Sequence, residues 1–540
     1  MLSYLRGTLK FTALLTLFVL TALDVTGQQK YWVFFTDKEG VSFDPLTYFD
    51  QKAIDRRIKH NIPLNDPSDW AVKQEYIDGV TTIASLVSKS SRWFNALAVQ
   101  ATPSEIKKIT ELTFVKSANA FKTTVKPLTA EKIGSVKAEL SSYNKELLKF
   151  QTSRMQGGLF TTGGIDGSGI RVAIFDVGFP QVDTHPALEH IRKAKKIIET
   201  YDFVRNKEHV YGHNGHGRSV LSCIAGIHQG TNMGLATGAD FLLAITERMV
   251  SENFAEEENW VAAIEWADKN GADIVSSSLG YTYHRYFPDE MNGSVSLVAR
   301  AANKAASKGM LIVNAAGNEG SNNWVTIVTP GDADSVLTIG GIDPKRDMHV
   351  NFSSYGPTAD KRMKPNVCAL GIVVVANKNF VTTSSGTSFS TPLVAGFAAC
   401  AMQRFPNMTN MDMFKAIEAS AHLYPYYDYA HGYGIPQADY FMKDNDNDVR
   451  PTFKFEEDED YINIIQLDGA FDHPDTLIVD KSPIRNLYYN IQNEKGALIR
   501  YGVVTAEEKR VLSFLKSEIG KHNSLFVHFE GYTDSYSLKF

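Results

Sequence analysis

Between residues 150 and 442, short apolar runs rich in β-branched residues alternate with segments of helical periodicity. Strands that are apolar on both faces and separated by helices are typical of a parallel sheet with helices on both sides. Two of the helical segments end at Gly271 and Gly309, where a left-handed cap favours glycine. The apolar runs stand at residues 170–175, 273–276, 310–313 and 336–339. The pattern predicts an α/β domain built on a doubly wound, mostly parallel sheet.

The region before this domain has a different pattern. Residues 28–124 combine a strand-like run at 31–35 with a helical, basic stretch at 54–60. A second helix is expected after Thr102, because Thr102 can cap it and Glu105 completes a capping pattern. This region is therefore predicted to form a small α+β domain.

Two further segments complete the predicted organisation of the 540-residue chain, which is longer than one hydrophobic core usually organises. Residues 125–149 are rich in Lys, Ser and Thr and weakly patterned, so they are predicted to be a linker that contains a processing site. Residues 448–540 contain short alternating runs and are predicted to form a β-rich C-terminal module.

The first 27 residues have the features of a cleaved secretory signal peptide. Arg6 and Lys10 precede an uncharged stretch at 11–23, and small residues follow it up to Gly27. The apolar stretch is shorter than the roughly 18 residues that a membrane-spanning helix needs. We therefore expect export, a secreted protein that can stay associated with the cell surface, and no membrane span once the signal is removed.

Charge and cysteine content narrow the function classes. A net charge of -6 and a pI near 6.2 give no overall basic field for a nucleic-acid partner. The three cysteines, Cys223, Cys368 and Cys400, show no CxxC spacing and are expected to be buried small hydrophobes, with a disulfide or a reactive thiol as the alternative. His213 and His216 form an HxxH pair, but no further ligand cluster follows, so no metal site is predicted.

Two residues at predicted element boundaries are candidates for a functional site. Asp176 ends an apolar strand, at the sheet edge where open α/β folds place their sites, although a cap or an ion pair would also explain it. His216 stands between glycines at the start of a helical run, and an imidazole can accept and return a proton near neutral pH.

Two more residues could bind a reacting carbonyl group. Ser388 precedes a small, apolar helical run in which Pro392 suits the first turn, so its hydroxyl would face free backbone N–H groups. A capping serine is the alternative interpretation. Asn318 follows a buried strand and could donate its amide to an oxyanion.

Taken together, these segments resemble the subtilisin-like serine peptidases. GTSFSTPLVAG around Ser388 is similar to the family's GTSMAxPHVAG, AAGNEG around Asn318 matches its oxyanion segment, and the order Asp, His, Asn, Ser is the family's order. The resemblance covers residues 150–442 and implies the subtilisin fold and a serine endopeptidase that forms an acyl-enzyme.

The resemblance also implies a role for each site residue. Asp176, His216 and Ser388 would form the catalytic triad, and the Asn318 amide with the Ser388 backbone N–H would bind the oxyanion. Peptide substrate would lie against five small or apolar residues: Ser278, Leu279, Gly280, Ala316 and Gly317. No cofactor is required by this chemistry; the family often binds structural calcium, for which no ligands can be named here.

Two motifs depart from the usual family pattern. The DSG or DTG segment is DVG at Asp176, and HGTHVAG is HGRSVLS at His216, so the second His is replaced by Ser219. Packing behind the site is expected to differ. The same changes occur in the secreted subtilisin-like enzymes of Bacteroidetes-type bacteria that the chain resembles. On that resemblance, residues 28–124 would be an inhibitory, chaperone-like pro-domain, removed by self-cleavage within the linker.

Two acidic clusters allow weaker hypotheses. Four carboxylates, Glu252 and Glu256 to Glu258, precede a predicted helix, where a favourable helix dipole explains them. In the family that the chain resembles, the segment before this helix pairs with the extended substrate, and the resemblance therefore suggests a preference for basic residues in the peptide. Residues 444–448 have the opening spacing of a calcium loop, but Val449 stands where glycine is needed, so a solvated linker is favoured.

A rival from another class is a catalytically silent peptide-binding or adhesion protein whose C-terminal module carries the function. Fold alone does not exclude it. The presence of nucleophile, base, orienting acid and oxyanion donor together favours the enzyme.

Overall fold

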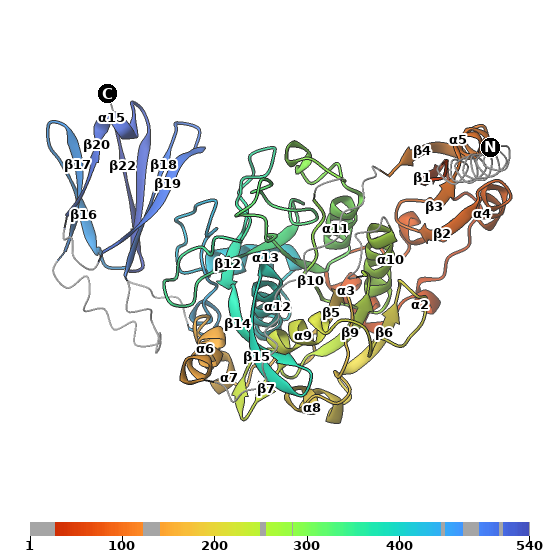
Figure 1. Ribbon diagram of the computed structural model, residues 1–540, viewed down its shortest axis with the longest axis horizontal. Helices are drawn as coiled ribbons and strands as arrows, with labels where there is room; N and C mark the ends of the chain where they lie inside the picture. The colour runs from red at the N-terminus through yellow and green to blue at the C-terminus, as the bar shows by residue number, and fades with distance from the viewer. Residues whose placement is uncertain are drawn as a thin grey trace, which may run out of the picture. The chain divides into compact units, whose positions relative to one another are not determined.

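The computed structural model describes seven stretches of the chain: residues 27–121, 141–248, 255–282, 285–443, 449–467, 485–506 and 511–538. Residues 1–26 of the predicted signal, most of the predicted linker, and the acidic run at 444–448 lie outside these residues. The chain divides into two units (Figure 1). The first is Met1–Pro45 with Asn65–Thr124, and the second is Leu46–Leu64 with Val125–Phe540.

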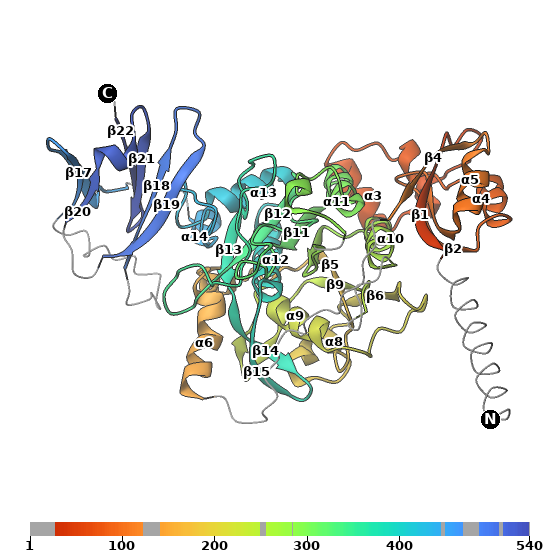
Figure 2. The same ribbon diagram turned by 45° about the horizontal axis from the view of Figure 1, so that its top comes forward.

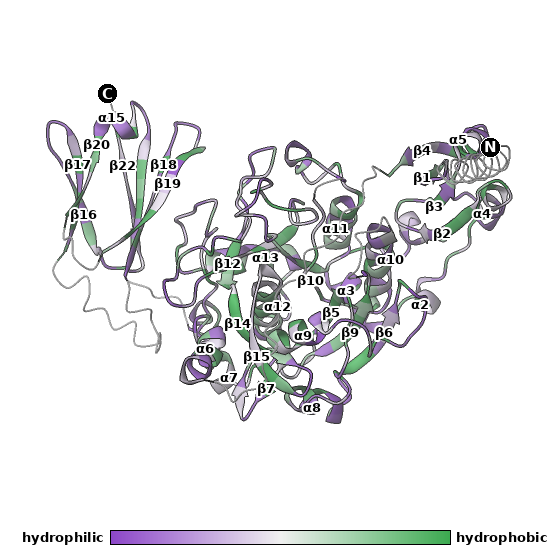
Figure 3. Ribbon diagram, viewed as in Figure 1, coloured by the Kyte–Doolittle hydropathy of each residue, from purple (hydrophilic) through white to green (hydrophobic). Residues whose placement is uncertain are grey.

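The second unit is built on a seven-stranded sheet whose paired strands all run parallel. Its strand order is β13-β12-β11-β10-β5-β9-β6, which confirms the predicted α/β architecture. Hydrophobic stretches run along these strands, as expected of strands buried on both faces (Figure 3). The strands are β13 (Val367–Leu370), β12 (Val336–Ile342), β11 (Leu311–Ala315), β10 (Ile274–Ser277), β5 (Arg171–Asp176), β9 (Asp240–Ile245) and β6 (Ile197–Asp202).

Helices cover both faces of this sheet. On β5, Val172 and Ile174 join the core that contains α9 (His216–Ala225) and α12 (Thr387–Arg404). The next side chain, Phe175, packs edge-to-face on Trp260 of α10 (Ala255–Lys269). Successive strand residues point to opposite faces, so α10 lies on the face opposite α9 and α12. Helix α11 (Leu297–Ser307) packs beside α10.

The first unit is a small α+β domain, as predicted. Its antiparallel sheet has the order β2-β3-β1-β4. Thr102 and Glu105 form the expected reciprocal capping box at the start of α5. The elements are β1 (Gln29–Phe35), α4 (Gln74–Thr81), β2 (Leu86–Ser91), β3 (Ala96–Ala101), α5 (Pro103–Thr110) and β4 (Val115–Ala120).

The C-terminal region is β-rich, as predicted, and has a hydrophobic core of its own. Hydrogen bonds join it to the rest of the second unit: the Tyr426 hydroxyl donates to the Tyr489 carbonyl at 2.9 Å, and the Asn490 amide donates to the Tyr427 carbonyl at 2.7 Å. The two sheets are β16 (Phe453–Glu457), β17 (Tyr461–Gln466) and β20 (Val511–Leu515), and β19 (Leu498–Thr505), β18 (Asn486–Gln492), β21 (Ser524–Phe529) and β22 (Tyr532–Ser537).

Candidate active site

Asp176 and His216 form a hydrogen-bonded pair at the carboxyl end of the parallel sheet. Asp176 is the last residue of β5 and is fully buried, and both of its carboxylate oxygens lie 2.9 Å from His216 Nδ1. His216 is the first residue of α9, and its backbone N–H donates to Asn214 Oδ1 at 2.8 Å. The pair can therefore hold the imidazole in one orientation, with Nε2 directed away from the carboxylate.

Two glycines allow the loop after β5 to approach the start of α9 this closely. A Cβ atom on Gly178 would lie 2.5 Å from the Gly212 carbonyl oxygen, and one on Gly217 would lie 2.5 Å from the Gly178 carbonyl oxygen. Real Cβ atoms do not come so near a backbone oxygen. Glycine is thus required on both sides of the Asp176–His216 contact.

Ser388 is the second residue of α12, and the helix is preceded by Gly386, whose φ of 146° suits glycine. The expectation that Pro392 stands in the first turn of this helix is wrong, because the helix begins at Thr387 and Pro392 lies inside it. The His216 and Phe389 rings lie with their centroids 5.3 Å apart, which places the imidazole beside the residue that follows Ser388.

The proline inside α12 alters the hydrogen bonding of Ser388. Pro392 has no N–H to donate to the carbonyl four residues earlier, which belongs to Ser388. The Ser278 hydroxyl donates to that carbonyl instead, at 2.8 Å. This bond joins the start of α12 to the segment after β10 that was predicted to bind substrate.

Asn318 is held by the first residue of the same helix. Its Oδ1 accepts hydrogen bonds from the Thr387 backbone N–H and from the Thr387 hydroxyl, both at 2.9 Å. Since an amide oxygen can only accept, these two donors determine which end of the side chain faces Thr387. The Nδ2 donor is directed to the other side.

The five predicted substrate-binding residues lie on two neighbouring backbone segments. Ser278, Leu279 and Gly280 follow β10, while Ala316 and Gly317 follow the adjacent strand β11.

Val328 packs against both of these segments. A Cβ atom on Gly280 or Gly317 would lie within 2.6 Å of a Val328 methyl group. The Val328 backbone N–H also donates to the Ala316 carbonyl at 3.1 Å. Sequence reasoning did not identify Val328, because only the fold brings it beside the two glycines.

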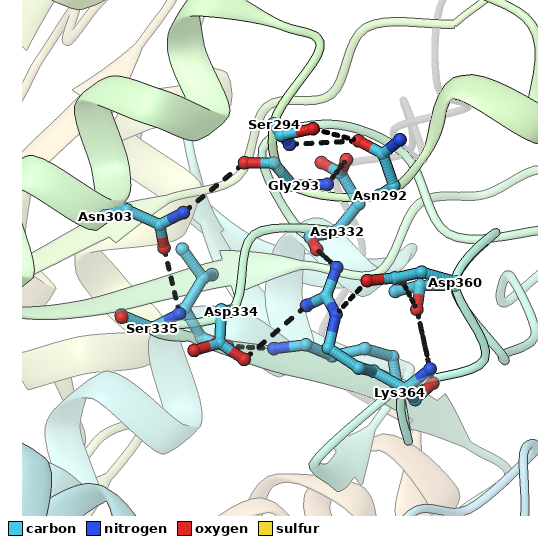
Figure 4. Close-up of polar contacts among 12 residues, drawn as sticks. Asn292, Gly293, Ser294, Asn303, Asp332, Asp334, Ser335, Asp360 and Lys364 are labelled. Carbon is cyan, nitrogen blue, oxygen red and sulfur yellow. Dashed lines mark hydrogen bonds and ion pairs between the residues drawn. The ribbon is translucent and has the colours of Figure 1, made fainter.

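A polar network fixes the chain that continues from Val328 toward β12 (Figure 4). Asp332 accepts from the Gly293 N–H at 2.7 Å, and its carbonyl accepts from Arg362 Nη2 at 2.8 Å. Asn303 joins the Gly293 carbonyl to the Ser335 N–H. Nearby, burial lowers the pKa of Lys364 to about 7. The segment that follows Val328 is therefore hydrogen-bonded to two other loops, one at Gly293 and one at Arg362.

Arg218 was not predicted to matter, yet it connects three segments behind the site. Its buried guanidinium donates to the Pro180 carbonyl, to the Ala376 carbonyl and to Asn377 Oδ1 at 3.0–3.2 Å, and also to Gln181 Oε1. Burial lowers its pKa to about 10.

Ser219, at the position of the family's second His, donates to the Ala376 carbonyl at 2.8 Å. Together with Arg218 it joins α9 to residues 376 and 377 behind the site.

The acidic cluster does not present its carboxylates to a substrate in the way that we hypothesised. Arg285 pairs with Glu256 at 3.1 Å and with Glu257 at 3.3 Å, and all three side chains are buried. Burial raises the pKa of Glu257 even so. Glu252 lies outside the described residues. Because a cation of the chain already compensates Glu256 and Glu257, a preference for basic substrates loses its support.

The three cysteines are buried structural residues. All three cysteines are free and buried, as expected, and burial raises the pKa of the Cys223 and Cys400 thiols. Within the described part of the chain, no group of three or more His, Cys, Asp or Glu residues is arranged to hold a metal ion.

Comparison with known proteins agrees with this geometry. The subtilase family model matches residues 167–437, and a model of the peptidase S8 propeptide domain of Bacteroidota matches residues 30–138. The thermostable alkaline protease of Halalkalibacterium halodurans is 31% identical over 48% of this chain and 63% of its own length.

Subtilisin DY of Bacillus licheniformis is 29% identical over 48% of this chain and 85% of its own length. Serine protease AprX of Bacillus subtilis is 29% identical over 45% of this chain and 59% of its own length. The matched region thus spans less than two thirds of two of these three relatives. Because the family model covers half of the sequence, the chain belongs to the subtilase family, with a Bacteroidota-type propeptide domain before the peptidase domain.

Proposed function

We propose that this protein is a secreted serine endopeptidase made as a self-processing precursor. The observation that carries the proposal is the Asp176–His216 pair, bonded at 2.9 Å at the end of β5 and placed beside the first turn of α12, which carries Ser388. The names of the relatives, which are proteases, support the same activity.

In the proposed mechanism, Ser388 Oγ attacks the carbonyl carbon of the scissile peptide bond. His216 takes the hydroxyl proton and gives it to the leaving amine, and water then releases the acyl group by the same route in reverse. Asp176 holds the imidazole through Nδ1 and stabilises its protonated form. Nucleophile, base and orienting acid are all side chains of this chain, so the proposed steps need no cofactor.

The tetrahedral intermediate carries a negative oxygen that needs hydrogen-bond donors. We assign this role to Asn318 Nδ2 and the Ser388 backbone N–H. Thr387 supports the assignment because it holds Asn318 by its oxygen end. Ser388 N–H lies in the first turn of an 18-residue helix, where backbone N–H groups have no helical acceptor and the dipole favours negative charge.

For substrate binding we propose the two segments at Ser278–Gly280 and Ala316–Gly317. Their backbones follow adjacent parallel strands and could pair with an extended peptide on either side. Gly280 and Gly317 keep Val328 against both segments, so Val328 would shape the pocket for the residue before the scissile bond.

The propeptide match supports a precursor in which residues 28–124 act as an intramolecular inhibitor until the chain is cut within 125–149. The proposed secretion rests on the signal-like residues 1–27. Among the helices that the structure describes, none has the length and apolar character needed to cross a membrane.

The test is covalent labelling of the secreted protein with a fluorophosphonate probe, followed by peptide mass spectrometry and a casein hydrolysis assay. The proposal predicts one adduct on Ser388, loss of casein hydrolysis in proportion to labelling, and no labelling after His216→Ala. A soluble, folded protein that neither reacts at Ser388 nor cleaves casein would refute it and favour a silent binding protein.

A further inference from the structure

A helix from the propeptide region is part of the second unit. Residues 46–64 lie within the propeptide family match, yet they belong to the same unit as the parallel sheet. They contain α3 (Gln51–Lys59), which both ribbon views show beside α10 and α11 (Figures 1 and 2). The helix thus packs against the peptidase domain.

Helix α3 binds at the amino ends of the parallel strands. Lys52 Nζ lies 2.8 Å from Asp273, just before β10, and 2.7 Å from the Gly169 carbonyl, just before β5. Asp50, which caps α3, pairs with Arg171 at the first position of β5. Asp176 is at the other end of β5, so α3 is docked on the sheet edge opposite the catalytic pair.

The centre of the contact is a buried charge cluster. Asp268, near the end of α10, accepts hydrogen bonds from both Arg56 and Arg57, the latter at 2.6 Å. All three side chains are at most 2% exposed. A buried carboxylate is costly unless cations compensate it, so removing α3 would leave Asp268 without these two partners.

Arg56 also binds the carboxyl ends of two helices. Its guanidinium donates to the Ala272 carbonyl and, at 3.1 Å, to the Lys308 carbonyl. These carbonyls follow the last turns of α10 and α11, where carbonyl groups lack helical donors and the dipole favours a cation. The two helix ends and Asp268 together form an anionic socket that α3 fills with arginine.

The backbone at both helix ends is shaped for this segment. A Cβ atom on Gly271 would lie 2.8 Å from Lys52 Cβ and 2.9 Å from the Ala53 nitrogen. One on Gly309 would lie 3.1 Å from Ile62 Cδ1. The two glycines therefore end their helices and also leave room for residues 52–62. On α3, Ala53 is fully buried against this surface.

We infer that residues 46–64 stay bound to the peptidase domain after the precursor is cut, as a non-covalent part of the mature enzyme. The inference rests on the proposed processing within 125–149, which breaks a peptide bond far along the chain from α3. Its contacts lie away from the catalytic pair, so freeing the active site does not undo them. Release of this segment from the rest of the pro-region would need a second cut beyond residue 64.

The experiment uses the full-length Ser388→Ala precursor with an engineered site for a specific protease within residues 122–140. It reads binding without self-processing, so its result is independent of whether the proposed peptidase activity is right. After the cut, native mass spectrometry should find the pro-region fragment on the peptidase fragment. Hydrogen exchange should show α3 amides protected as strongly as those of β5.

A double variant Arg56→Gln/Arg57→Gln tests the socket, and Ile58→Ser, on the 60% exposed Ile58, is the matched control. The double variant should raise the dissociation constant of the cut fragment about 100-fold or more, while the control leaves it unchanged. If the double variant does not fold, the exchange measurement on the parent still decides.

Unprotected α3 amides in the cut parent would overturn the inference. So would equal retention of the double variant and the control, since residues outside the socket would then hold the fragment.

Discussion

The Ser278 hydroxyl donates a hydrogen bond to the backbone carbonyl of Ser388 at 2.8 Å, in the place of the helical bond that Pro392 cannot make. Pro392 leaves the Ser388 carbonyl in the first turn of α12 without a helical donor, and Ser278, in the proposed substrate-binding segment, supplies a donor from its side chain. The position of the proposed nucleophile is thereby coupled to the wall against which the peptide would lie.

Removing this bond should impair both stability and activity. Ser278→Ala leaves the Ser388 carbonyl without its side-chain donor, so the free energy of unfolding should fall by about 1–3 kcal/mol, with a fall of roughly tenfold in kcat/KM. Urea unfolding and peptide hydrolysis measure the two effects. Ser276→Ala is the control, because the buried Ser276 hydroxyl has no hydrogen-bond partner among the residues that the structure describes. Equal behaviour of the two variants would contradict the coupling.

The orientation of Asn318 predicts a graded effect at Thr387. Thr387→Val removes one of the two donors to Asn318 Oδ1 and keeps the backbone N–H. We expect kcat to fall about tenfold with little change in KM, which is less than the roughly 100- to 1000-fold loss when an oxyanion donor is deleted. Thr387→Ser should restore the rate. Rates of the serine variant as low as those of the valine variant would argue against orientation by the hydroxyl.

Arg218 should contribute mainly to stability. Arg218→Met removes the buried guanidinium that donates to the Pro180 carbonyl, to the Ala376 carbonyl and to the Asn377 side chain, and only the Ser219 bond to the Ala376 carbonyl is kept among those described above. The expected loss is at least about 3 kcal/mol in the free energy of unfolding. Lys193→Met, in an exposed ion pair, should change it by less than about 0.5 kcal/mol. Chemical unfolding of both variants in the Ser388→Ala background avoids self-digestion, and similar midpoints would refute the role.

The buried Lys364 should make stability depend on pH in the alkaline range. Its pKa is about 7 in the folded protein and has its ordinary value of 10.5 in the unfolded chain. Between these values the unfolded state binds a proton that the folded state does not, so stability rises with pH from about 7 to 10.5. The slope from this group approaches about 1.4 kcal/mol per pH unit.

Lys364→Met should reduce this slope by up to about 1.4 kcal/mol per pH unit, which corresponds to one bound proton. Urea unfolding at several pH values in that window measures the slope. Lys361→Met, on an exposed side chain of the same loop, should keep the parent's slope. Parallel curves for the parent and the Lys364 variant would show that Lys364 keeps its proton in the folded protein.

The sequence predicted the strands well because their apolar runs are buried on both faces. The run at 170–175 became β5 at Arg171–Asp176, and the run at 336–339 became the first part of β12. The start of α12 was predicted wrongly. A proline usually marks the first helical turn, and the donor that makes Pro392 tolerable inside the helix, Ser278, is 110 residues away from Ser388.

Contacts between distant segments were beyond prediction for the same reason. Arg218 stands in an apolar helix, and nothing nearby in sequence indicates that its acceptors lie 37 and 38 residues earlier and 158 and 159 residues later. The basic stretch at 54–60 was predicted to be helical, but the buried partner of Arg56, Asp268, is 212 residues away. Local patterns predict elements, whereas the pairing of buried charges depends on tertiary structure.

The most direct test compares secreted wild type with Ser388→Ala, following precursor mass by mass spectrometry and casein hydrolysis in parallel. The account predicts that wild type loses its pro-region connection and cleaves casein, while the variant keeps its uncut mass and is inactive. Identical maturation of both proteins with no hydrolysis by either would contradict the central claim that Ser388 is the nucleophile of a self-processing peptidase.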